Sequence, residues 1–152
     1  MAALDDRMAK PTVLDVVTHR DFGWVRYACI STYANEPQHE VLKRLGLVFD
    51  GEPLRELKGS EVQALLVEVF ARPLAYSTGP VVSAERAQSL AEMCEDSLFP
   101  TGARFYTNVA ADSPPDNPLG ALVAVSEGHT FGVGVVAISP CAAACVWVEE
   151  ED

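Results

Sequence analysis

The chain has 152 residues, of which 49% are hydrophobic, and it carries 22 acidic against 11 basic residues, for a formal net charge of −11. This hydrophobic content excludes a disordered chain, and the length fits a single domain, residues 1–152, with a substantial core. An excess of negative charge disfavours nucleic acid and acidic membranes as partners and favours a basic protein, although many proteins are acidic for solubility alone.

The N-terminal third predicts a loose lead-in, a strand and a short helix. Residues 1–11 are charged and lack the apolar core of a signal peptide, so we expect a cytoplasmic protein with free thiols. Trp24 to Tyr33 is rich in β-branched and aromatic residues, which favours a strand, although one helix face would also fit. Asn35 or Glu36 as cap, followed by Pro37, predicts a helix that ends before Gly46.

Two amphipathic helices are predicted in the middle of the chain. Ser60 is expected to cap the first, whose apolar face runs from Val62 to Phe70. Ser83 is expected to cap the second, which turns Ala87, Ala91 and Cys94 inward. The acidic residues elsewhere on this helix, such as Glu92 and Glu95, are interpreted as a solvated face.

A loop and three β-type runs complete the chain. Residues 104–109 alternate as in a strand, and 111–120 form a loop rich in proline and aspartate. The apolar runs 121–125, 130–138 and 142–148 predict an antiparallel meander. A helix that starts at Ser139 is the alternative for the last run. The fold class is therefore α+β, with a mainly antiparallel sheet, a C-terminal β-meander and helices from the middle of the chain packed on it.

The segment 131–148 is 18 residues long and has no charged residue, which is the length of a membrane-spanning candidate. Glycines and Pro140 interrupt it, and neither Lys nor Arg flanks it. We therefore expect two buried strands joined by a turn at Ser139-Pro140 and no membrane partner.

The sequence contains few candidate catalytic or metal-binding residues. No phosphate loop, dinucleotide fingerprint or nucleophile elbow is present, and His129 in a predicted turn is the one plausible general base. Cys141 and Cys145 would share a metal ion on a helix, whereas on a strand they would lie about 13 Å apart. We expect no catalytic residue, no metal site and no cofactor.

Four adjacent carboxylates, Glu149 to Asp152, directly follow Trp147, and their mutual repulsion predicts exposure. Trp147 is expected to anchor the strand, so that the charges begin at a fixed place on the sheet edge beside an aromatic ring. This arrangement suits Lys- and Arg-rich surfaces, whereas a frayed terminus would have no function. With the acids of the 111–120 loop as second candidates, the predicted partner-binding residues are Trp147, Glu149, Glu150, Glu151, Asp152, Asp112 and Asp116.

The pattern Phe131-Gly132-Val133, then Pro140, then residues 146–152 resembles the C-terminus of bacterial immunity proteins that neutralise polymorphic, contact-dependent or type VI toxins. The small, acidic, single-domain profile without a catalytic motif is also similar to that group. The resemblance implies a non-enzymatic inhibitor that blocks the active site of one cognate toxin, often a basic nuclease. Two alternatives stay open: a small cytosolic enzyme or ligand-binding domain that uses His129, and a subunit that self-assembles, for example as a homodimer, through its C-terminal strands.

Overall fold

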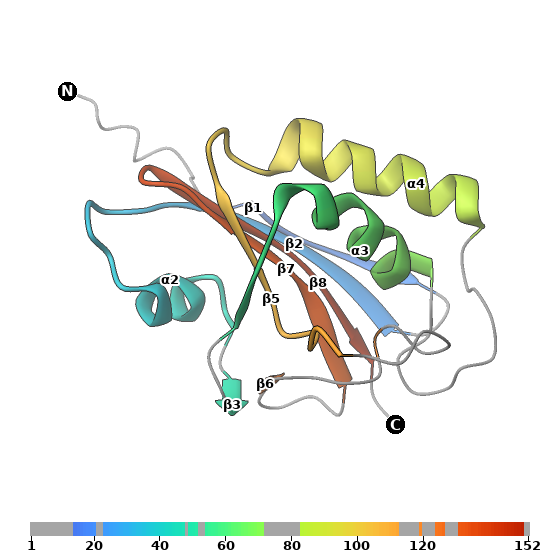
Figure 1. Ribbon diagram of the computed structural model, residues 1–152, viewed down its shortest axis with the longest axis horizontal. Coiled ribbons are helices and arrows are strands. Elements are labelled where there is room, and N and C mark those ends of the chain that lie inside the picture. The colour runs from blue at the N-terminus through green and yellow to red at the C-terminus, as the bar shows by residue number, and fades with distance from the viewer. Residues whose placement is uncertain are drawn as a thin grey trace.

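A computed structural model describes residues 14–20, 23–47, 49–51, 54–71, 83–112, 119, 124–126 and 131–150. These residues form an α+β fold of antiparallel strands and helices, which confirms the predicted class (Figure 1). The strands are β1 (Leu14–Arg20), β2 (Gly23–Ser31), β3 (Phe49–Gly51), β4 (Arg55–Leu57), β5 (Arg104–Thr107), β6 (Ala124–Ser126), β7 (Phe131–Ile138) and β8 (Ala142–Glu150). The helices are α2 (Gln38–Arg44), α3 (Gly59–Ala71) and α4 (Ala84–Met93), and α4 continues into a π-helical turn, η1 (Cys94–Leu98).

Within the described residues, the main sheet has six strands in the order β1-β2-β8-β7-β5-β4. The β7–β8 hairpin and its turn confirm the predicted pair of strands, and the alternative helix from Ser139 is wrong. Ser139 instead closes the turn, because its Oγ accepts hydrogen bonds from the backbone N–H groups of Ala142 (3.1 Å) and Cys141 (3.3 Å). The predicted meander is only partly correct, since β6 pairs with β3 in a separate two-stranded ribbon and not with β7.

Both faces of the main sheet are covered, because side chains on successive strand residues point to opposite sides. On β8, Ala144, Val146 and Val148 pack under α3 and α4, whereas Cys145 and Trp147 pack with the apolar side of α2. Figure 1 shows α3 and α4 side by side on one side of the sheet and α2 apart from them. The charge-free segment 131–148 therefore forms two central strands of the sheet, and both faces of these strands are covered. No helix in the described part of the chain is long and apolar enough to cross a membrane.

Local hydrogen bonds determine the residues at which the helices begin. Ser83 caps α4 as predicted, because its Oγ accepts a hydrogen bond from the backbone N–H of Arg86 (3.1 Å). Ser60 does not cap α3. That helix begins one residue earlier, and the Glu61 carboxylate accepts a hydrogen bond from the backbone N–H of Lys58 (2.9 Å), the reciprocal half of a capping box. Pro37 is the cap residue of α2, which has no side-chain cap.

Candidate interaction surface

Trp147 lies inside the protein and not on its surface. Its side chain is 0% exposed, and on β8 it stands opposite Gly134 of β7. A Cβ atom at Gly134 would lie 2.6 Å from Trp147 Cε3 and would overlap the carbonyl oxygen of Val146, so the indole ring lies directly over the glycine. Trp147 therefore anchors its strand from within, and the interpretation of its ring as a surface for a partner is wrong.

The first two residues of the acidic run belong to the sheet. Glu149 stands opposite Trp24 of β2 and Gly132 of β7, and Glu150 stands opposite Phe131. Since β8 lies between β2 and β7, these acids stand at the end of a central strand and not at the sheet edge, where we had placed them. Glu149 is half-buried. Glu151 and Asp152 lie outside the described residues.

The structure brings one loop acid to the same end of the sheet as Glu149. The side-chain amide of Asn108 donates a buried hydrogen bond to the carbonyl oxygen of Gly132 (2.7 Å), and Gly132 is the β7 neighbour of Glu149. The chain leaves the sheet here towards Asp112, which is exposed. Two of the predicted binding acids thus share one end of the molecule, and Asp116 lies outside the described residues.

A second set of acidic side chains lies on the helical layer, and its members on α4 and η1 are those that the sequence predicts as a solvated face. Within the described parts of α3, α4 and η1, Arg86 is the one basic residue. Four acids of this layer are exposed and two are half-buried. The acidic residues are Glu61, Glu68, Glu85, Glu92, Glu95 and Asp96. We name this surface the helical acidic face.

Hydrogen bonds between α3 and α4 hold part of this face in a defined geometry. Gln63 donates to the Glu95 carboxylate (2.9 Å), and Gln88 donates both to the side-chain oxygen of Gln63 (2.9 Å) and to the Glu92 carboxylate (3.1 Å). Because two glutamates are tied to their neighbours, they lose less side-chain entropy when a partner binds. The network also crosslinks the two helices that cover the sheet.

An exposed aromatic ring is fixed at the turn between β2 and α2. Tyr33 is 71% exposed, and the Arg44 guanidinium lies over its ring, 5.0 Å from the ring centre. Arg44 donates two hydrogen bonds to Glu36 (2.9 and 3.0 Å) and a third to the carbonyl of Ser31. The hydrogen bonds from Arg44 lower the pKa of Glu36, and the same contact raises the pKa of Arg44. This cluster fastens α2 to the sheet.

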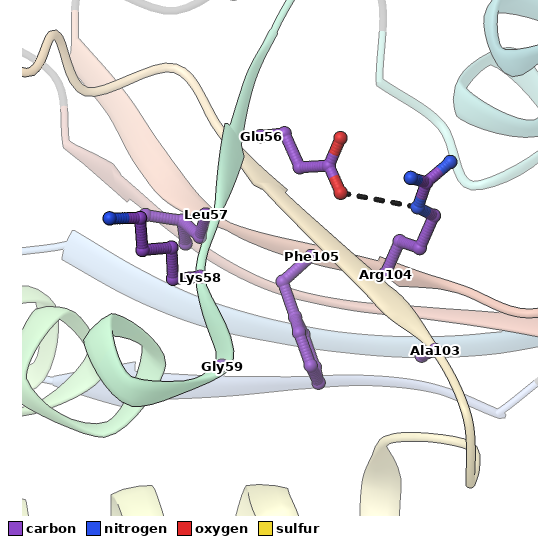
Figure 2. A pocket seen from close by; sticks show the side chains of 7 residues that line it. All are labelled: Glu56, Leu57, Lys58, Gly59, Ala103, Arg104 and Phe105. Carbon is purple, nitrogen blue, oxygen red and sulfur yellow. Dashed lines mark ion pairs between the residues drawn. The ribbon is translucent and has the colours of Figure 1, made fainter.

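A hollow of about 510 Å³ lies where β4 and β5 diverge (Figure 2). The strands pair from Arg55–Thr107 to Leu57–Phe105 and then separate towards α3 and the 100–103 turn. Two of the lining residues, Arg104 and Glu56, form an exposed ion pair (Nε to carboxylate 3.2 Å). The lining residues are Glu56, Leu57, Lys58, Gly59, Ala103, Arg104 and Phe105, and none of them is a Cys, Ser or His nucleophile or base.

The cysteines are chemically distinct from one another. Burial, reinforced by the charge of Glu95, raises the pKa of the Cys94 thiol to about 12, so this thiol stays protonated and unreactive at neutral pH. Cys145 is buried in β8, whereas Cys141 is exposed in the hairpin turn. Among the described residues, no group of three or more His, Cys, Asp or Glu side chains could hold a metal ion. His129, the candidate base, lies outside the described residues.

The sequence matches no family model and no curated protein, and the fold matches no solved structure.

Proposed function

We propose that this protein is a stoichiometric inhibitor of the immunity or antitoxin type, which binds a basic toxin domain and blocks its active site. The observation that carries the proposal is the helical acidic face, where the described helices hold six acids and one arginine. Glu61 forms an ion pair with Arg55 (4.0 Å), and part of the set is held by the Gln63–Gln88 network. The resemblance of residues 131–152 to immunity proteins points the same way.

The mechanism rests on charge. A surface of one sign attracts an oppositely charged partner over several ångströms and accelerates association, and salt reduces this effect. Acids held in place would occupy the cationic cleft in which a nuclease-type toxin holds phosphate groups. The acids at the end of β8, Glu149 and Glu150, together with Asp112, form a second candidate contact, since they share one end of the sheet.

The first experiment is capture of a partner by the tagged, full-length protein from lysate of its native host, at low and at moderate salt. The proposal expects one basic protein at near one-to-one stoichiometry, which is toxic when expressed alone and is neutralised by co-expression. Absence of any basic partner at low salt, with the host secretion systems expressed, would contradict the proposal.

The second experiment locates the contact with charge-neutral variants. A triple variant of the helical acidic face, Glu85→Gln, Glu92→Gln and Asp96→Asn, should slow association with the captured toxin at least tenfold at low salt. Glu40→Gln, compared with Glu85→Gln alone, is the matched control, because each removes one exposed charge, the first from α2 and the second from the helical acidic face. Substitutions are preferable to truncation after Val148, because truncation would also remove the β8 residues that pair with Trp24 and Gly132. Unchanged association in the triple variant would exclude the helical acidic face.

A further inference from the structure

The two edges of the main sheet differ in length. At one edge, β4 pairs through three residues only. At the other edge, all seven residues of β1 pair in unbroken register with β2, from Leu14–Cys29 to Arg20–Gly23, without a bulge. No strand in the described part of the chain pairs with the outer edge of β1. This long regular edge strand has neither proline nor lysine, and its charged residues, Asp15 and Arg20, are of opposite sign, so they do not repel a second copy of the strand as a row of like charges would.

The C-terminal strands cannot provide a route to self-assembly by strand pairing. β7 lies between β8 and β5, and β8 lies between β2 and β7, so the pairing edges of both strands are occupied. Val135, Val136 and Val146 on these strands are 0% exposed. In the described residues, β7 and β8 therefore offer no free edge to a second copy, and the outer edges of the main sheet are those of β1 and β4.

The sequence of β1 is complementary to itself. In a symmetric antiparallel pair, one residue must stand opposite its own copy, and the register that pairs all seven residues centres on Val17. This register sets Asp15 opposite His19 of the second copy and Leu14 opposite Arg20, each twice by symmetry. No two like charges stand opposite each other, so this register avoids the like-charge pairs that destabilise antiparallel sheets.

The local charge also favours a second copy at this edge. The segment from Leu14 to Arg20 holds one acid and one arginine, so its formal charge is zero in a chain of net charge −11. Two copies that meet through β1 therefore keep most of their acidic residues away from the contact.

We propose that β1 pairs with β1 of a second copy, antiparallel about Val17, to give a two-fold symmetric dimer with one continuous sheet. The dimer does not depend on the proposed toxin-binding function and leaves the helical acidic face of each copy available as a separate site. Strand addition at an exposed edge is a common mode of protein association.

Cysteine crosslinking of the full-length protein tests the register directly, in a Cys141→Ser background that removes the exposed native thiol. Opposite residues have Cα atoms roughly 4.5–5.5 Å apart, within disulfide range, whereas residues two places out of register lie roughly 7–8 Å apart. Under oxidised glutathione, Val17→Cys should form a covalent dimer. Val16→Cys alone and Thr18→Cys alone should not, but an equimolar mixture of the two should crosslink.

Two results would overturn the proposal. One is equal crosslinking of all three single variants, which indicates collision without register. The other is a monomer by sedimentation at every concentration up to about 1 mM, together with no crosslink at position 17. A second variant that keeps the strand intact adds a quantitative check. His19→Glu faces Asp15 with a like charge and should weaken dimerisation roughly tenfold, and Asp15→Lys in the same chain should restore it.

Discussion

Replacement of Gly134 by alanine provides the sharpest test of the sheet centre. The added methyl group would overlap the carbonyl oxygen of Val146 and would lie 2.6 Å from Trp147 Cε3 and 2.9 Å from Trp147 Cα. Two of these atoms belong to the backbone of β8, so rotation of a side chain cannot relieve the overlap. β7 and β8 would have to move apart in the middle of the sheet.

The expected cost follows from these contacts. Forcing one extra methylene into a well-packed core typically costs about 1–3 kcal/mol, and the backbone overlap places Gly134→Ala at about 3 kcal/mol or more. A domain of this size is stable by about 5–15 kcal/mol, so the variant would lose a large share of its stability. Urea denaturation followed by circular dichroism measures the difference, provided that the denaturant dependence of the free energy of unfolding is unchanged.

Two other glycines serve as matched controls. A Cβ at Gly59 meets nothing within 4 Å at the start of α3, so Gly59→Ala should leave stability unchanged or raise it by up to about 1 kcal/mol. Gly102 also has open space but a φ of +76°, so Gly102→Ala should cost about 1 kcal/mol through backbone strain. A loss below about 1 kcal/mol for Gly134→Ala would show that Gly134 and Trp147 are not neighbours, and that the β7–β8 register is wrong.

Three further predictions follow from single contacts. Glu36→Gln removes the charged partner of Arg44 and should cost about 1 kcal/mol of stability at pH 7. Because the pKa of Glu36 is lowered in the folded state, this stabilisation is present above the unfolded-state pKa and is lost as the pH falls through the folded-state pKa. The unfolding curves of the two proteins should therefore converge in acid. Thr107→Val removes a buried hydrogen bond from Oγ1 to the Gly134 carbonyl (2.7 Å) and should lower the free energy of unfolding by about 1–3 kcal/mol; thermal unfolding that matches wild type would refute this contact. In native protein, Cys141 should react with iodoacetamide much faster than Cys145, as peptide mass spectrometry can measure, and equal rates would contradict their assigned exposures.

Local signals in the sequence predicted the elements well. Ser83 begins α4 because a hydroxyl before an apolar helical face satisfies an N–H group that the helix leaves open. The turn at Ser139 and Pro140 was predictable because serine and proline separate two apolar β-branched runs. At Ser60 the same reasoning failed, because α3 already begins at Gly59. The Glu61 carboxylate accepts a hydrogen bond from the backbone N–H of Lys58, the residue before the helix, and no serine cap is used.

Strand order and the inclusion of Glu149 and Glu150 in β8 could not be derived in this way. Alternation of apolar residues indicates that a strand is buried, but it does not identify the neighbouring strand. For this reason the sequence predicts that β6 pairs with β7, whereas β6 pairs with β3. Four adjacent acids predict exposure from local repulsion alone. The first two nevertheless belong to β8, because β2 and β7 extend far enough to pair with Glu149.

The position of β8 has a consequence for how the protein is made. Its partner β2 lies more than a hundred positions earlier in the chain, so the first hairpin emerges from the ribosome long before the strand that connects it to β7. Until β8 inserts, the facing edges of β2 and β7 are open and able to pair with the wrong chain. Sheets that depend on such distant pairings fold slowly, on the order of milliseconds to seconds. Synthesis that stops before β8 would therefore yield two incomplete sheets, and the interrupted chain would be a substrate for chaperones and proteases.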